Sequence, residues 1–169
     1  MRLVVSIKNV VFGVVVSVGL SCGVANANWV FQEQGGAFSD DSLKLAVTVS
    51  QTGLALGVRC TNSDKLELAF ITEEKIKAKT ADTLNLLAPL LRLRVDSNDI
   101  IDFDVVLSEA DGILMGIATA QPNLLSEIKK AKRKISVVLS IAGEQYHETV
   151  FSVRGSTKAM QKLESKCGF

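Results

Sequence analysis

The sequence is poor in the side chains that most enzymes use for acid–base and metal chemistry. Its 169 residues contain one histidine, His147, and three cysteines. Zinc sites are usually built from several His and Cys ligands, so this chain has few from which to assemble one. A Gly-x-Ser-x-Gly elbow, a common signature of serine hydrolases, is absent too. We therefore predict no catalytic residues, no metal and no cofactor.

An excess of charge of one sign is also missing. The chain has 19 Lys and Arg side chains against 18 Asp and Glu, and aromatic residues make up only 5% of it. Domains that bind nucleic acid usually carry a clear basic surplus, because they neutralise phosphates. The balance of charge therefore argues against a nucleic-acid partner.

The first 27 residues have the three-part pattern of a secretory signal peptide. Arg2 and Lys8 give a positive start, residues 10–24 are mostly apolar, and Ala25-Asn26-Ala27 offers the small residues that signal peptidase requires. We expect cleavage after this site, and hence a periplasmic or secreted protein.

Two alternatives to a cleaved signal remain open. An uncleaved membrane anchor would need roughly 20 apolar residues, more than this run provides. A lipid on Cys22 would need a leucine three residues earlier, where the chain has Gly19. Cleavage leaves a single β-rich domain over residues 28–169, with no transmembrane segment.

The two cysteines of the mature chain predict a disulfide. Cys22 is removed with the leader, so Cys60 and Cys167 remain in an oxidising compartment. Both end apolar stripes, one on an expected strand and one on an expected helix, so both should face the core. The alternative is a pair of free buried thiols.

Alternation of apolar and polar residues with a period of two dominates the mature chain. Such alternation indicates strands with one face in a core, and turn residues separate the segments. About eight short strands predict a mainly β fold, an antiparallel β-sandwich or open barrel. The segments span residues 43–49, 54–60, 66–70, 91–95, 103–107, 113–117, 135–141 and 146–153.

One or two surface helices complete the predicted fold. Apolar residues at helical spacing follow Pro122, and a second such stripe begins after Ser156, a plausible N-cap. The second helix would be C-terminal and would carry Cys167. Residues 72–88 could form a short helix or an irregular edge segment.

Two hairpin registers can be predicted from the pattern of faces. In the first, Arg92 pairs with Asp104 and Arg94 pairs with Asp102 across the sheet. In the second, a three-residue turn at 143–145 sets Val137 opposite Phe151.

The alternative for the second hairpin is a two-residue turn over Gly143 and Glu144. It would place Glu148 opposite Leu139 and so put a carboxylate on the core face, which is costly without a partner. The three-residue turn instead leaves Glu148 outside and puts His147 at the edge of the core.

A basic run is the strongest local charge feature. One interpretation is contact with an anionic surface, such as lipid headgroups, lipopolysaccharide or an acidic partner. The other is a solvated helix end, where the helix dipole favours cations. The run comprises Lys129, Lys130, Lys132, Arg133 and Lys134.

The order of several landmarks resembles the periplasmic accessory proteins of the VasI/TagO type, which are associated with bacterial type VI secretion. The C-terminal strand-Gly-helix ending also resembles invasion-associated locus B proteins. The first resemblance implies an envelope location, and its paired cysteines would correspond to Cys60 and Cys167. The landmarks are Trp29, Asp40-Asp41-Ser42, Val58-Arg59-Cys60, Arg94-Val95-Asp96, Phe151-Ser152-Val153-Arg154-Gly155-Ser156, Ala159, Leu163 and Cys167.

Taken together, these features predict an exported, non-enzymatic binding or assembly module. Its expected partners are proteins of the cell envelope, with a possible accessory role for an envelope or secretion machine. The alternative is a small periplasmic hydrolase with a site that has no sequence signature.

Overall fold

The computed structural model describes residues 28–35, 42–60 and 65–169. The predicted signal peptide with Cys22, and the landmark Asp40-Asp41, lie outside the described residues. The part of the chain that is described forms nine strands and three helices. The strands are β1 Val30–Gln34, β2 Leu43–Val49, β3 Ala55–Cys60, β4 Leu66–Lys75, β5 Leu90–Val95, β6 Ile101–Ala110, β7 Ile113–Ala120, β8 Lys134–Ile141 and β9 Glu144–Ser152, and the helices are α1 Ala78–Asn85, α2 Asn123–Lys130 and α3 Ser156–Cys167.

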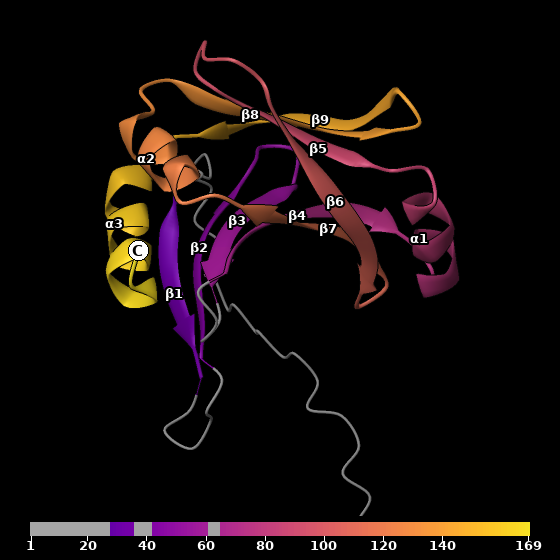
Figure 1. The fold of residues 1–169 in the computed structure, drawn as a ribbon, viewed down its shortest axis with the longest axis horizontal. Coiled ribbons are helices and arrows are strands. Elements are labelled where there is room, and N and C mark those ends of the chain that lie inside the picture. The colour runs from indigo at the N-terminus through magenta and orange to yellow at the C-terminus, as the bar shows by residue number, and fades with distance from the viewer. Residues whose placement is uncertain (1–27, 36–41, 61–64) are drawn as a thin grey trace, which may run out of the picture.

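The strands form one sheet in the order β1-β2-β3-β4-β7-β6-β5-β8-β9, and all its strand pairs are antiparallel. The sheet curls into a half-barrel, with β5, β8 and β9 forming one layer above β1–β4 and β7 (Figure 1). Strand β6 links the layers, because residues 101–104 pair with β5 and residues 105–110 pair with β7. The predicted mainly β, open-barrel fold is confirmed.

The core lies between the two layers. Phe70 of β4 meets Phe151 of β9 edge to face, with ring centroids 6.4 Å apart. Burying a side chain of this size stabilises the folded chain by about 1.5–3 kcal/mol. The strands therefore pack so that the apolar face of each alternating segment is buried. The largest fully buried side chains include Phe70, Phe151, Leu56, Leu66, Leu68, Leu91, Leu93, Leu107 and Ile135.

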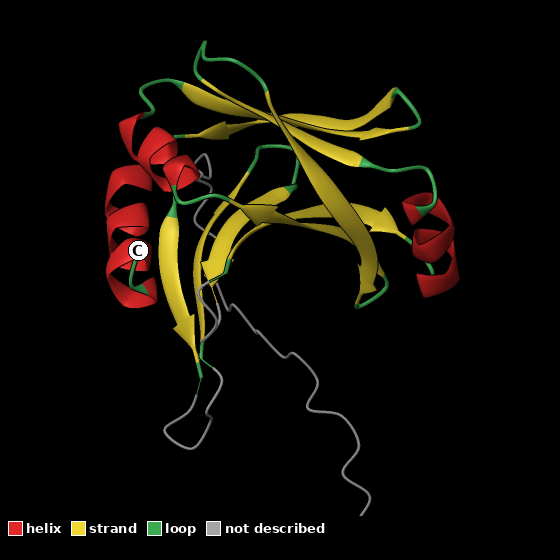
Figure 2. Cartoon of the chain, in the orientation of Figure 1, coloured by secondary structure: helices red, strands yellow, loops and turns green. Residues whose placement is uncertain are grey.

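The helices cover the two ends of the half-barrel (Figure 2). At one end, Asn85 of α1 holds the helix on β6, since its amide donates to the Leu107 carbonyl at 2.8 Å and accepts from the Leu107 N–H at 2.7 Å. Of the two possibilities for residues 72–88, the helix is the one found, after β4 ends at Lys75. At the other end, α2 packs against α3.

Helix α3 is fixed to the sheet by the predicted disulfide. Cys60 on β3 bonds to Cys167, with Cα atoms 6.2 Å apart, a usual separation for such a bond. The expected N-cap at Ser156 is wrong. Gly155 occupies that position with a φ of 80°, while the buried Ser156 hydroxyl donates to the Ile128 carbonyl of α2 at 3.0 Å.

The hairpin between β5 and β6 departs from the predicted register by two residues. Arg92 lies opposite Asp102 and forms an ion pair with it at 2.9 Å, not with Asp104. Arg94 forms no ion pair with any described residue. The turn is centred one residue earlier than expected, since the Asn98 N–H donates to the Val95 carbonyl at 3.0 Å, and Asp96, with a φ of 54°, bonds to the start of β8.

The β8–β9 turn is also different from both predicted forms. Ala142 and Gly143 form a two-residue turn with φ values of 52° and 86°, the left-handed pair that suits the twist of a hairpin. Leu139 therefore lies opposite Tyr146, and neither the turn over 143–145 nor its alternative is correct.

An unpredicted bulge in β9 then shifts the register. Val137 lies opposite Thr149 rather than Phe151, because two residues of β9 oppose Val138. One of them, His147, has a φ of 55°, the conformation that absorbs an extra residue in a bulge. The bulge keeps Thr149 buried on the core side.

No helix in the described ranges is both long and apolar enough to cross a membrane.

Candidate functional site

The basic run lies where α2 ends and β8 begins, and its backbone is anchored by one carboxylate. Asp96 accepts hydrogen bonds from the N–H groups of Lys132, Arg133 and Lys134 at 2.8, 2.8 and 2.9 Å. These N–H groups, with that of Lys132 first, hold the pKa of the Asp96 carboxyl below its usual 3.8. The anchor fixes the segment while the side chains of residues 132–134 stay exposed.

The structure divides the five predicted basic residues into two groups. Lys129 is half-buried and pairs with Glu164 of α3 at 2.7 Å, so it joins the two helices. Lys130, Lys132, Arg133 and Lys134 are exposed and form no ion pair with any other described residue. Four of the five therefore remain free to meet an anionic partner.

Helix α3 brings further cations to the same end of the molecule. Lys158, Lys162 and Lys166 follow one another at intervals of four and so share one side of the helix. Lys162 lies 5.8 Å from the centre of the Phe31 ring, and Lys166 lies 3.5 Å from Glu33. A shallow hollow of about 580 Å³ separates these lysines from β1. Their spacing was visible in the sequence, but the packing of α3 on α2 was not.

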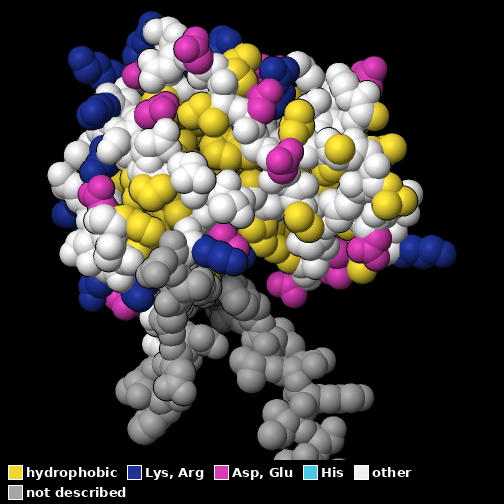
Figure 3. Space-filling model, viewed as in Figure 1, with side chains coloured by type: hydrophobic (Ala, Val, Ile, Leu, Met, Phe, Trp, Pro, Cys, Tyr) yellow, Lys and Arg dark blue, Asp and Glu magenta, His cyan; other side chains and the backbone are white. Residues whose placement is uncertain are grey.

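We call this surface the basic face. In Figure 3, Lys and Arg side chains gather on the left of the molecule, where Figure 1 places α2 and α3. Residues 123–134 and 154–167, with Asp96 and Glu33 that contact them, together carry nine basic and four acidic side chains, a net charge of +5. The rest of residues 28–169 carries eight basic and 14 acidic ones, a net charge of −6. The basic face comprises Lys130, Lys132, Arg133, Lys134, Arg154, Lys158, Lys162 and Lys166.

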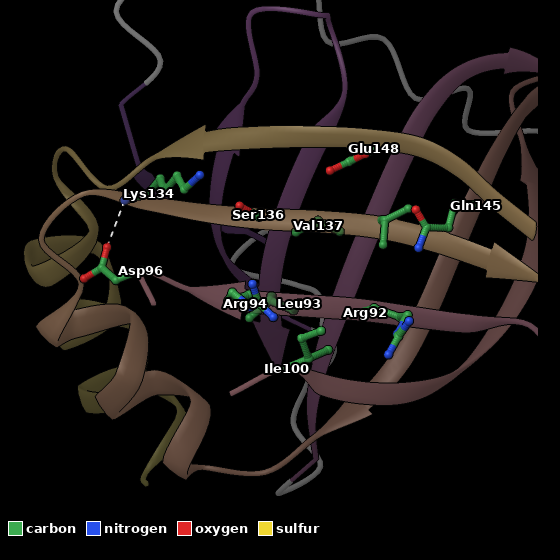
Figure 4. A pocket seen from close by; sticks show the side chains of 11 residues that line it. Arg92, Leu93, Arg94, Asp96, Ile100, Lys134, Ser136, Val137, Gln145 and Glu148 are labelled. Carbon is green, nitrogen blue, oxygen red and sulfur yellow. Dashed lines mark hydrogen bonds between the residues drawn. The ribbon is translucent and has the colours of Figure 1, made fainter. Parts of the chain in front are cut away.

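A second hollow, of about 300 Å³, lies on the outer side of the β5–β8–β9 layer and adjoins the basic face through Lys134 (Figure 4). Arg94 lies opposite Ser136 in the sheet, and this short side chain leaves room beside the guanidinium. Glu148 lines the hollow from β9. The hollow therefore offers charges of both signs, and it is less basic than the face beside it.

His147 lies at the opposite end from the basic face, in the region of α1. Its Nε2 lies 2.7 Å from Oε2 of Glu74 on β4, and its side chain is half-buried. The three-residue turn that would put His147 at the edge of the core does not form, and His147 lies in the bulge of β9 instead. The residues that the structure describes contain no group of three His, Cys, Asp or Glu side chains placed to hold a metal ion.

The comparisons with known proteins find a similarity of fold. No protein-family model matches the sequence, and no curated protein matches it either. Among solved structures, the fold is similar to that of invasion associated protein b from Bartonella henselae, with a TM-score of 0.55 and 12% identity over 84% of this chain and 96% of that one. The likeness shows a shared architecture and agrees with the resemblance of the C-terminal part to invasion-associated locus B proteins.

Proposed function

We propose that this chain is an exported, non-enzymatic binding module that holds an acidic protein partner on its basic face. The observation that carries the proposal is the separation of charge, with +5 at the two-helix end, Asp96 and Glu33 included, and −6 on the rest of residues 28–169. A chain with nearly balanced total charge gains nothing in solubility from such an arrangement, but gains a strongly oriented electric field.

Charge separation of this kind affects association in two ways. The positive end attracts an acidic partner over about one Debye length, roughly 8 Å at physiological salt, and raises the association rate. The negative remainder repels the same partner and so favours one orientation. Asp96 and the Lys129–Glu164 pair hold the basic face in place before binding, which reduces the ordering cost of association.

The proposed location is the periplasm or the exterior of the cell. The Cys60–Cys167 disulfide supports it, because such bonds persist mainly in oxidising compartments. The leader pattern of residues 1–27 supports it independently. The resemblance to VasI/TagO proteins supports a finer version of the proposal, in which the module assists the assembly of a secretion machine.

Crosslinking in intact envelopes tests the proposal. A photoreactive side chain replaces Gln161, which lines the hollow on the basic face. We expect one acidic protein to be captured, with a yield that falls when Lys130, Lys132 and Arg133 are all changed to Gln.

The matched control changes Lys75, Lys77 and Lys79 to Gln, three exposed lysines near α1 at the other end. This variant has the same net charge as the first, so it separates the basic face from total charge. An adduct of equal yield in both triple variants would show that the basic face does not hold the partner.

A further inference from the structure

A small hollow lies at the end of the half-barrel that α1 covers, away from the basic face. Its volume is about 220 Å³, smaller than the roughly 300–1,000 Å³ of pockets for drug-sized ligands, so only a ligand of a few carbons would fit. The wall is apolar, formed by Leu84 and Leu87 near α1, Leu114 of β7 and Ile141 of β8. Leu87 is 48% exposed, so the wall is open to solvent on one side.

The rim of this hollow is polar, and one hydrogen bond crosses it. His147 of β9 reaches Glu74 of β4 at 2.7 Å, and so links the upper and lower layers of the half-barrel. This contact depends on the bulge, since the positive φ of His147 sets the direction of the ring. Glu144 and Tyr146 complete the rim, and neither has a hydrogen-bonding side-chain partner among the described residues.

The two carboxylates of the rim accept hydrogen bonds, while the Tyr146 hydroxyl can both donate and accept. A carboxylate accepts only, and both Glu74 and Glu144 present oxygens at the rim. His147 Nε2 lies at Oε2 of Glu74, whereas the Glu144 carboxylate has no side-chain hydrogen-bond partner among the described residues. A ligand head that donates hydrogen bonds therefore suits the rim, and two carboxylates favour one with a positive charge.

We propose that this hollow binds a small organic cation, an amine with an apolar body of a few carbons. The apolar body contacts Leu87, Leu114 and Ile141, and the ammonium group lies between the carboxylates of Glu74 and Glu144. Charge complementarity distinguishes this occupant from a fatty acid, whose carboxylate would meet both acidic side chains. The site is separate from the basic face, so it does not depend on the proposed function.

The test compares three probes with the same six-carbon body, hexylammonium, hexanol and hexanoate, in binding to the exported protein. Methyl NMR on the disulfide-bonded chain follows Leu87, Leu114 and Ile141 during each titration. We expect hexylammonium to shift these methyl signals and to bind about fivefold more tightly than hexanol, because an exposed ion pair contributes at most that much. Hexanoate should bind more weakly than hexanol.

Two variants assign the effect to the site. Glu144→Gln removes one carboxylate at the exposed start of β9 and should remove most of the preference for hexylammonium over hexanol. Glu148→Gln changes a carboxylate of the same strand that lines the outer hollow instead, and should leave binding unchanged. Equal affinity for all three probes, a preference for hexanoate, or shifts outside this hollow would each overturn the proposal.

Discussion

The indole N–H of Trp29 donates a hydrogen bond of 2.9 Å to the carbonyl oxygen of Ser152, at the end of β9. The backbone N–H of Trp29 also donates to the carbonyl of Arg154 at 2.9 Å. Trp29 immediately precedes β1, so these bonds join the two edge strands of the nine-stranded sheet. The buried indole thus closes one end of the half-barrel.

Replacing this tryptophan should weaken the closure. Trp29→Phe removes the indole donor and part of the buried surface, and we expect the free energy of unfolding to fall by about 1–3 kcal/mol. Urea unfolding followed by circular dichroism measures the change, because the variant lacks the only tryptophan. Tyr146→Phe, at an exposed aromatic position, is the control and should change stability by less than about 0.5 kcal/mol. Equal stability of the two variants would contradict the closing role.

Gly155 should tolerate substitution less well than a glycine of the same backbone conformation elsewhere. Gly155 and Gly112 have φ values of 80° and 82°, but a Cβ at Gly155 would lie 2.9 Å from the Trp29 carbonyl oxygen, whereas Gly112 has open space. Gly112→Ala should therefore cost about 1 kcal/mol from its backbone alone. Gly155→Ala should cost clearly more in the same denaturation experiment. Equal costs would mean that the Trp29 backbone can shift away from the added Cβ with no loss of stability.

Loss of the disulfide should lower stability substantially. The bond joins residues 107 apart in the sequence, and closing so long a loop restricts the unfolded chain by about 4–5 kcal/mol in the chain-entropy account. A Cys60→Ala, Cys167→Ala double variant should therefore lose about 2–5 kcal/mol. Thermal unfolding with and without reductant checks this, since reductant should destabilise the parent chain and leave the variant unchanged. Two thiols that react freely in the native, oxidised protein would disprove the bond.

The Asp96 anchor should make stability depend on pH in acid. Its pKa is lower in the folded chain than the usual 3.8, so its contribution is complete above about pH 4 and is lost as the pH falls through the folded value. Asp96→Asn should destabilise the protein at pH 7, and the difference from the parent should shrink at pH 2. Asp99→Asn, in the same turn, is the matched control. A difference for Asp96→Asn that does not vary with pH would show that the carboxylate charge is not what stabilises the loop.

The fold class and the disulfide could be predicted because they depend on local patterns. Period-two stripes define which residues face the core, and an even number of cysteines after residue 27 suggests a pair. The hairpin registers could not be predicted in the same way. Pairing Arg92 with Asp102 rather than Asp104 shifts the strand by two residues, which leaves every side chain on the same face.

The candidate sites were predictable only where their residues are neighbours in the sequence. The residues of the basic run follow one another closely, so they could be identified together. The contact between His147 and Glu74 joins residues 73 apart, and it depends on a bulge at a residue other than glycine, for which the sequence carries no signal. The lysines of α3 have a visible spacing, but only the tertiary packing of α3 on α2 places them beside Lys130.

Strand β9, which carries the bulge at His147, lines two different hollows. On one side of it the strand lines the hollow at the end of the half-barrel with His147, and on the other it lines the outer hollow with Glu148. Two residues that are adjacent in the sequence therefore line different hollows, so a substitution at either one alters the lining of a single hollow.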